Sequence, residues 1–239
     1  MYRKPRNRRR LNLRRLLWLL FSLPVWLWAL SAVLVLLLRF VPPITTSFML
    51  QTSLRNGFYT YQWQPYEQIS PNMALAAIAA EDQRFPTHKG FDVDEINAAL
   101  RDAENGASLR GASTISQQVA KNLFLWPGGG FVRKGVEAWL TALIELMWTK
   151  QRILETYLNV AQFSDRTFGV EAASQQFFQI SARDLTPDEA ALLAAVLPGP
   201  ELYSIDSPSP AVWSRQSWIL TQMDQLGGTA YLQHLYEVP

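Results

Sequence analysis

An uninterrupted apolar run near the start of the chain constrains the fold more than any other feature. Leu16 to Leu38 reads LLWLLFSLPVWLWALSAVLVLLL, which is 23 residues without a charge. A helix needs about 20 such residues to cross the hydrocarbon core of a bilayer. The core of a secretory signal peptide has about 7–15 residues and ends at a small-residue cleavage site, unlike the RFVPP found here. We therefore predict one uncleaved N-terminal transmembrane helix over residues 16–41, kinked but not broken by Pro24.

The charge distribution orients this helix. Residues 1–15 carry eight basic residues and no acidic one, whereas the rest of the chain has 14 Lys and Arg against 20 Asp and Glu. A basic arm can bind nucleic acid, but next to a membrane helix it is explained by the preference of Lys and Arg for the cytoplasmic side. We expect a cytoplasmic arm, a single-pass protein of the bacterial cytoplasmic (inner) membrane, and no nucleic-acid partner. The remainder faces outward, into the periplasm if the host is Gram-negative.

The outward part is predicted to be mainly α-helical. It has no cysteine and must rest on its core. Residues 42–66 are taken as a linker and residues 67–239 as one domain. Ser70 and Pro71 suit the cap and first position of a helix, and the sequence TPDE from Thr186 forms a capping box that starts another. We find no notable strand alternation.

The stretch AAIAAEDQRFPTHKGFD, residues 76–92, places a carboxylate pair at the end of an apolar helix. Burial and the negative end of the helix dipole should both raise the pKa of Glu81, which suits a general base. The alternative is an ordinary acidic residue at a helix end. Since the chain has only two histidines, His88 is expected to brace the turn rather than to bind a metal. Gly90 is expected to allow a backbone geometry that a side chain would block.

A second informative segment is LRGASTISQQVAKNLFLWPGGGFVRKGVE, residues 109–137. Ser113 is a candidate N-cap. The helix after it would have an apolar face and a polar face, formed by Ile115, Val119 and Leu123 and by Thr114, Gln117 and Lys121 respectively. The apolar loop with three glycines that follows, flanked by Trp126 and Phe131, is expected to dip into the membrane interface.

These segments resemble a known family. Glu81-Asp82-x-x-Phe85-x-x-His88-x-Gly90-Phe91-Asp92 is similar to the first motif of the biosynthetic peptidoglycan glycosyltransferases. A looser match, the fifth, lies at Arg215 to Met223. The second, third and fourth matches follow the first in family order and read Gly111-x-Ser113-Thr114-Ile115-x-Gln117-Gln118-x-x-Lys121-Asn122, Arg133-Lys134-x-x-Glu137 and Lys150-x-x-Ile153-Leu154-Glu155-x-Tyr157-Leu158-Asn159. The matches span roughly residues 67–230. With the N-terminal anchor, and a chain ending at Pro239 without room for a transpeptidase domain, they resemble the monofunctional enzyme.

The resemblance implies a lysozyme-like helical glycosyltransferase domain that polymerises lipid II. The growing glycan on undecaprenyl pyrophosphate would be the donor, and the 4-hydroxyl of the acceptor sugar would attack its anomeric carbon. An inverted β-1,4 bond would form and undecaprenyl pyrophosphate would leave. Lipid II, the growing glycan strand and the bilayer are therefore the expected partners. Cell-wall synthesis or division proteins are left open as others.

The resemblance also implies residue roles. Glu81 would be the catalytic base, and Glu137 would assist departure of the pyrophosphate, directly or through a divalent cation such as Mg²⁺ or Mn²⁺. No organic cofactor and no defined metal-ligand set is expected. Arg133 and Glu137 are also spaced to form a plain helical ion pair. The substrate-binding candidates are Asp82, Ser113, Thr114, Gln117, Gln118, Lys121, Arg133, Lys134 and Glu171. Asp82 has the alternative of orienting the motif, and Glu155 is interpreted as structural.

Two departures and two other functions remain open. Gln162 and Ser164 stand where the family usually has Glu and Gly, which removes a charge. A lysozyme-like lytic enzyme would share the fold class but has less need of Lys121, Arg133 and an apolar membrane loop. A non-catalytic membrane scaffold for cell-wall proteins would not need both Glu81 and Glu137.

Overall fold

The computed structural model describes residues 13–104 and 113–236, and within these the side chains of residues 13–17, 19–21, 100 and 103 are left out. Most of the basic arm, Gly111 at the start of the second informative segment, and residues 237–239 lie outside the described residues. The helices and strands, in chain order, are α1 (Leu13–Leu38), α2 (Ser47–Asn56), β1 (Thr60–Tyr61), η1 (Tyr66–Gln68), α3 (Pro71–Glu81), α4 (Val93–Glu104), α5 (Ile115–Phe124), α6 (Phe131–Met147), α7 (Lys150–Val160), β2 (Gln162–Ser164), β3 (Thr167–Phe168), α8 (Val170–Phe178), η2 (Ala182–Asp184), α9 (Pro187–Val196), α10 (Pro210–Gln225) and η3 (Gly228–Leu235). The prediction of a mainly helical protein is confirmed.

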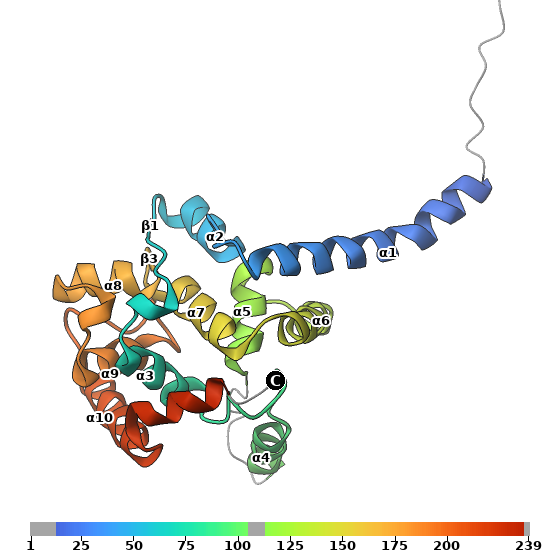
Figure 1. Cartoon of the computed structure of the whole chain (residues 1–239). Helices are drawn as coiled ribbons and strands as arrows, with labels where there is room; N and C mark the ends of the chain where they lie inside the picture. Colours follow the sequence, from blue (N-terminus) through green and yellow to red (C-terminus); the bar gives the residue numbers. More distant parts are fainter. Residues whose placement is uncertain (1–12, 105–112, 237–239) are drawn as a thin grey trace, which may run out of the picture.

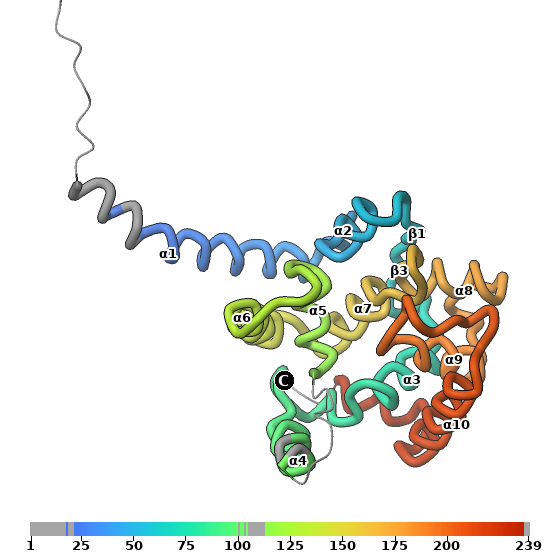
Figure 2. The backbone as a smooth tube through the Cα atoms, turned by 180° about the vertical axis from the view of Figure 1, so that it is seen from behind, coloured from blue at the N-terminus to red at the C-terminus, as the bar shows by residue number. Residues whose placement is uncertain are grey.

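The long helix α1 leaves the body of the molecule and runs past α6 (Figures 1 and 2). It continues through Pro24 without a break. Tryptophan side chains hold α1 to the domain. The ring of Trp28 on α1 stacks on that of Trp139 on α6, with centroids 3.9 Å apart. Trp148, the residue after α6, donates from Nε1 to the carbonyl of Val35 on α1 at 2.8 Å. Within the described part of the chain, no helix has the length and hydropathy that crossing a membrane requires.

Residues 42–66, taken as a linker from the sequence, are folded onto the domain. They contain α2 and β1, and α2 packs on α5 with Met49 fully buried. The hydroxyl of Tyr61 donates to the carbonyl of Pro43 at 2.8 Å, which ties the start of the segment to its end. Aromatic and apolar side chains at i, i+3 spacing are rare in this segment, so sequence periodicity gave a weak signal for α2.

Helices α3 and α9 form the centre of one half of the molecule, with α10 and η3 packed around them. Residues 73–79 of α3 and 190–196 of α9 are all buried, so both helices are apolar on every side, as in a core surrounded by other helices. The predicted starts are confirmed: Ser70 Oγ accepts from the backbone of Asn72, and Thr186 with Glu189 forms a capping box.

The other half consists of α5, α6 and α7, which pack against one another, with α4 at its margin (Figure 1). The N-cap of α5 is Thr114, so the prediction that Ser113 caps this helix is wrong. Thr114 forms the full capping box because a glutamine, Gln117, stands three residues after it. The predicted apolar face of Ile115, Val119 and Leu123 is buried, as expected.

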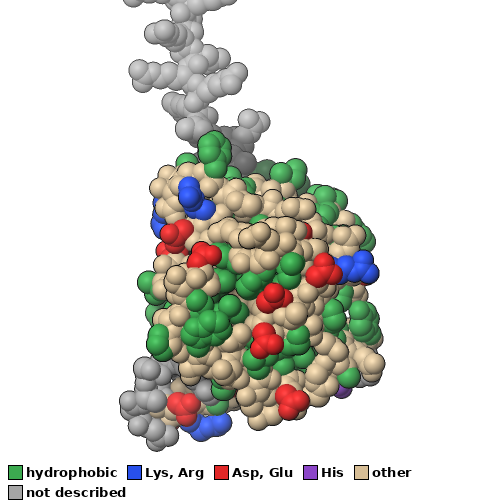
Figure 3. Space-filling view, turned by 90° about the vertical axis from the view of Figure 1, so that its left-hand side faces the viewer, with side chains coloured by type: hydrophobic (Ala, Val, Ile, Leu, Met, Phe, Trp, Pro, Cys, Tyr) green, Lys and Arg blue, Asp and Glu red, His purple; other side chains and the backbone are tan. Residues whose placement is uncertain are grey.

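A small sheet joins residues 60–61 to a hairpin of residues 162–168, although no strands were expected. Its order is β1-β3-β2, with β1 parallel and β2 antiparallel to β3. The strands have only two or three residues, too few for an alternating pattern to appear in the sequence. On the face in Figure 3, acidic side chains are spread among apolar ones rather than gathered into one patch. The acidic surplus outside the basic arm therefore forms no charged patch on that face.

Candidate active site

Glu81 is the last residue of α3, and its carboxylate is held between two other helices. Gln118 Nε2 on α5 donates to Glu81 Oε2 at 2.9 Å, and Arg215 Nη2 on α10 lies 3.4 Å from Oε1. Burial raises the pKa of Glu81, while the Gln118 hydrogen bond and the charges of Arg215 and Lys121 partly oppose this rise. The predicted direction of the shift is confirmed, and its main cause is desolvation.

Asp82 points the other way and braces the motif. Its Oδ2 accepts from the backbone N–H of Ile115 at 2.9 Å, which fixes the start of α5 against the end of α3. His88 Nε2 lies 2.9 and 3.0 Å from its two carboxylate oxygens, while His88 Nδ1 accepts from the backbone of Gly90 at 3.1 Å. Because Nδ1 accepts, Nε2 is the nitrogen that donates to Asp82. His88 therefore braces the turn as predicted, and for Asp82 the geometry favours orienting the motif over contacting substrate.

Gly90 allows two segments to approach closely. Its φ is 84°, and a Cβ there would lie 2.9 Å from side-chain carbons of both Glu145 and Thr141. Its carbonyl accepts from Thr114 Oγ1 at 2.7 Å. The expectation that a side chain would be blocked at Gly90 is confirmed.

The residues of the predicted polar face of α5 have two different roles: Thr114 and Gln117 cap the helix, and Lys121 lines a cavity of the site. Gln117 Oε1 accepts from the backbone of Thr114 at 3.0 Å, and both residues are buried. The side chain of Gln117 is thus engaged in the capping box. Gln118, the next residue, is the one that contacts Glu81.

Glu137 lies in a buried ion cluster near the start of α6. It is 2% exposed, pairs with Arg133 Nη1 at 2.7 Å and also contacts Lys134 Nζ. The helical pairing expected as the plain alternative is therefore present. Lys134 Nζ also lies 3.5 Å from Ser113 Oγ, which brings that candidate to the cluster.

Lys121 connects the two glutamates electrostatically. Burial lowers its pKa, and so do the charges of Arg133 and Lys134, whereas Glu137 and Glu81 act in the opposite direction. Its Nζ lies 5.5 Å from the centre of the Phe48 ring on α2. Lys121 and the cluster around Glu137 form a group of three cations with one paired carboxylate, which we call the cation group.

Two adjoining cavities open onto Glu81 and Lys121, while Arg133, Lys134 and Glu137 line neither of them. The first has a volume of about 650 Å³, and its lining includes Glu81, Asp82, Ser113, Thr114, Gln118, Arg215 and Trp218. The second has about 140 Å³, and its lining includes Lys121, Gln118 and Gln162. Gln118 and Pro198 line both cavities. A ligand lying across Gln118 would therefore reach Glu81 in one cavity and Lys121 in the other.

Glu171 is not brought to this site. Its carboxylate accepts from the backbone of Ala182 at 2.8 Å and from Gln175 Nε2 at 3.0 Å, and so joins α8 to η2. It lines neither of these two cavities. We assign it a structural contact in place of substrate binding. Glu155, paired with Arg152 at 2.9 Å, has the structural contact expected of it.

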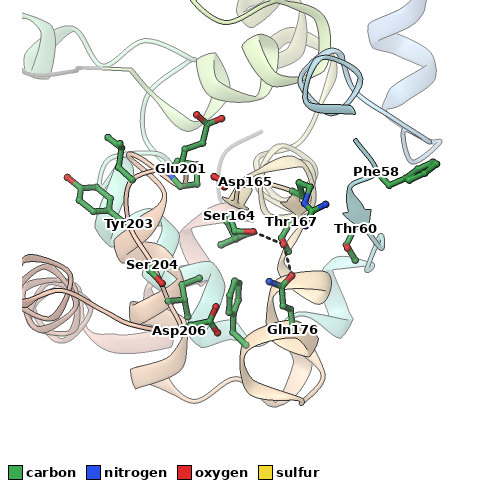
Figure 4. Close-up of a pocket in the computed structure, with 16 residues that line it drawn as sticks. Phe58, Thr60, Ser164, Asp165, Thr167, Gln176, Glu201, Tyr203, Ser204 and Asp206 are labelled. Atoms are coloured by element: carbon green, nitrogen blue, oxygen red, sulfur yellow. Dashed lines mark hydrogen bonds between the residues drawn. The ribbon is translucent and has the colours of Figure 1, made fainter. Parts of the chain in front are cut away.

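The two departures are satisfied by local hydrogen bonds. Gln162 Nε2 donates to the carbonyl of Ser164 at 2.9 Å. Ser164 Oγ lies 2.7 Å from Thr167 Oγ1, which lies 2.6 Å from Gln176 Oε1, a line of contacts drawn in Figure 4. Ser164, Thr167 and Gln176 border a third cavity of about 560 Å³. The neutral side chains at positions 162 and 164 are therefore both hydrogen-bonded within the hairpin.

Sequence reasoning missed three residues of the site. Arg215 lies in the loose fifth motif, which was the available signal. The hydroxyl of Tyr157, buried in the fourth motif, lies 3.5 Å from Gln118 Oε1. Trp218, on the wall of the first cavity, also lies within the loose fifth motif, which did not mark it as a site residue. Among the residues that the structure describes, no group of three His, Asp or Glu side chains is placed to hold a metal ion.

This arrangement suits a proton transfer beside an anionic group. A desolvated carboxylate faces one cavity, and preorganised cations lie beside the next, where they can stabilise developing negative charge.

Comparisons with known proteins agree with this chemistry. A family model described as Transglycosylase matches residues 52–224. A "Biosynthetic peptidoglycan transglycosylase" of Stutzerimonas stutzeri is 53% identical over 229 residues, covering 93% of this chain and 95% of the relative. Proteins with the same description from Pseudomonas fluorescens and Pseudomonas putida are each 50% identical, covering 89% and 93% of this chain and 91% and 95% of the relatives. The chain belongs to the transglycosylase family.

Proposed function

We propose that this chain is a monofunctional peptidoglycan glycosyltransferase that polymerises lipid II into β-1,4-linked glycan strands. The observation that carries the proposal is the position of Glu81, whose desolvated carboxylate lines a cavity of about 650 Å³ beside the cation group. A volume of this size lies within the range of about 300–1,000 Å³ that is usual for ligand sites. The descriptions of the relatives give the polymer.

The reaction follows from these two groups. The 4-hydroxyl oxygen of the acceptor sugar forms a bond with the anomeric carbon of the donor glycan, and its proton moves to the Glu81 carboxylate. The bond from that carbon to the pyrophosphate breaks on the opposite face, and its electron pair stays on the phosphate oxygen. Undecaprenyl pyrophosphate leaves, and the configuration at the anomeric carbon is inverted.

Glu81 acts as base only when it is ionised. Burial raises its pKa, so the ionised form is a stronger base than an ordinary glutamate. Gln118 donates to the carboxylate and keeps Oε2 in place. The charge of Arg215 opposes the rise in pKa and so favours the ionised form of the carboxylate.

The cation group receives the leaving pyrophosphate. Lys121 and Arg133 are positioned before the reaction, so little reorganisation is needed as charge develops. Arg133 has a planar guanidinium that suits phosphate oxygens, and its Nε is buried without a hydrogen-bond partner. Glu137 holds both Arg133 and Lys134. A divalent cation is compatible with a pyrophosphate substrate, but the described carboxylates do not provide a protein cage for one, so we derive no step through a metal.

We further propose that α1 anchors the enzyme in the cytoplasmic membrane, with the N-terminus inside and the catalytic domain outside. The support is the uncharged run Leu16–Leu38, the basic residues before it, and the continuous helix that the run forms. Its exposed tryptophans and leucines have little contact with the domain beyond α6. Trp126 and Phe131, which are 51% and 98% exposed, flank the apolar glycine-rich loop and would enter the interface.

The test uses the full chain in detergent with labelled lipid II, and compares wild type with Glu81→Gln. We expect polymer from wild type and none from the variant. Glu67→Gln is the matched control, because Glu67 is exposed and lines none of the three cavities described above. Equal polymer from Glu81→Gln would overturn the role of Glu81. No polymer from folded wild type would favour a scaffold, and shortening of added glycan would favour a lytic enzyme.

A further inference from the structure

The first cavity has an exposed aromatic wall next to the proposed base. Trp218 on α10 lines this cavity, and 45% of its surface is exposed. The guanidinium of Arg215 lies 5.9 Å from the centre of its ring, and the same guanidinium reaches Glu81 at 3.4 Å. Trp218 is therefore separated from Glu81 by one side chain. The proposed chemistry leaves this aromatic surface unused.

The positions of the two cavities indicate which part of a substrate would meet Trp218. Lys121 lines the second cavity, and Trp218 lines the first. A donor strand carries its pyrophosphate at the reducing end, on the anomeric carbon. If the pyrophosphate is held by Lys121, the sugars that precede this carbon extend across Gln118 and Glu81 into the first cavity. The acceptor sugar also approaches Glu81 in this cavity, and we assign the ring that meets Trp218 to the growing strand.

The lining of the first cavity matches the surface of a sugar. A pyranose ring has an apolar C–H face and a polar rim. Trp218 offers a flat apolar surface, and Arg84, Asp92 and Glu95 contribute charged side chains to the same lining. Stacking on a tryptophan removes apolar surface from water at little cost in side-chain entropy, because the ring is rigid.

We propose that Trp218 is a stacking platform for a sugar ring of the growing glycan strand, and that it retains the strand between additions and so sets product length. The inference rests on the proposed function and deepens it. Trp218 forms no bond with the reacting atoms, and the transfer step itself stays with Glu81 and the cation group. Loss of the platform should therefore release strands early while leaving single transfers largely intact.

The experiment compares product lengths from labelled lipid II for the full-length wild type, Trp218→Ala, Trp218→Phe and Trp213→Ala. Trp213 is the matched control, because it lies on the same helix, is 47% exposed and lines none of the three cavities. Losing one aromatic contact should weaken strand retention about 2- to 10-fold. We expect mean strands shortened by a similar factor for Trp218→Ala, with wild-type lengths for Trp213→Ala and intermediate lengths for Trp218→Phe.

The outcomes separate the inference from the function on which it rests. Wild-type lengths from Trp218→Ala would overturn the platform and leave the polymerase standing. Equal shortening by Trp213→Ala would also overturn it, because the effect would then not depend on the cavity. A fall in initial rate without a change in length would assign Trp218 to transfer in place of retention. No polymer from wild type would remove both the function and the inference.

Discussion

Glu81 and Glu137 are two helical glutamates of the candidate site, and their surroundings are opposite. Glu81 ends α3 and is held by a neutral amide at 2.9 Å, with its nearest cation at 3.4 Å and partly exposed. Glu137 lies in the first half of α6, where Arg133 at 2.7 Å and Lys134 both pair with it. The first carboxylate is desolvated with a single, longer ion pair to the partly exposed Arg215, and the second is paired with two cations. We infer that one is kept reactive and the other organises cations.

The largest expected effect comes from neutralising Glu81. Glu81→Gln should lower the polymerisation rate about 10²- to 10⁴-fold, the usual contribution of a positioned base. Because the pKa of Glu81 is raised in the folded state, ionisation opposes folding. The stabilising contribution is complete at pH values below the unfolded pKa and is lost as pH rises through the folded pKa. At pH 7 the variant should therefore unfold at the same temperature as wild type or higher.

The unfolding temperatures of wild type and Glu81→Gln, measured between pH 5 and 8, test the predicted effect of Glu81 on stability. The stability gap should widen as the pH rises. A variant that is clearly less stable than wild type at pH 8 would contradict the desolvated state assigned to Glu81.

Neutralising Glu137 should act in the opposite sense on stability. Glu137→Gln removes the partner of a buried guanidinium, and we expect a loss of about 1–3 kcal/mol in the free energy of unfolding. The rate should fall about tenfold to a hundredfold, less than for Glu81→Gln, because Arg133 and Lys121 stay present but less well held. Denaturant unfolding and initial rates measure the two effects.

The double variant Arg133→Gln/Glu137→Gln sharpens this result. Two residues that act as one unit give non-additive losses. We expect the double variant to lose less activity than the product of the two single losses. Full additivity would show that Glu137 acts on the substrate independently of Arg133.

The part of the site that the sequence could predict is the part encoded locally. The end of an apolar helix at Glu81, the brace at His88, the need for Gly90 and the spacing of Arg133 and Glu137 all follow from neighbours in sequence. The cap of α5 was misplaced by one residue because both Ser113 and Thr114 are good capping residues. The glutamine three positions after Thr114, which completes the box, decides between them.

The parts that could not be predicted depend on contacts between distant segments. Arg215 reaches Glu81 across 134 residues of sequence, and only the packing of α10 on α3 brings them together. Glu171 resembled a site residue, but the backbone of η2 occupies its carboxylate. The fold of residues 42–66 was missed because α2 buries few residues and is held mainly by its partner α5.

A smaller effect is expected from Arg215, the cation that lies beside Glu81. Its charge lowers the pKa of Glu81. Arg215→Gln should therefore shift the acid limb of the pH profile of kcat/KM to higher pH, since the base then ionises later. Arg215→Lys should restore most of the wild-type limb because it keeps the charge. The initial rate measured at several pH values between 5 and 9 tests this, and an unchanged limb with a lower plateau would show that Arg215 acts on binding alone.

The smallest effect is expected at Lys134, the exposed member of the cation group. Its side chain is 47% exposed, compared with 16% for Arg133, so water and salt screen its attraction to Glu137. Lys134→Ala should change the free energy of unfolding by less than about 1 kcal/mol, and the difference from wild type should shrink as salt is raised. Lys89→Ala, at another exposed lysine, is the control. A loss at Lys134 as large as that of Glu137→Gln, and insensitive to salt, would mean that Glu137 depends on both cations equally and that its compensation is not centred on Arg133.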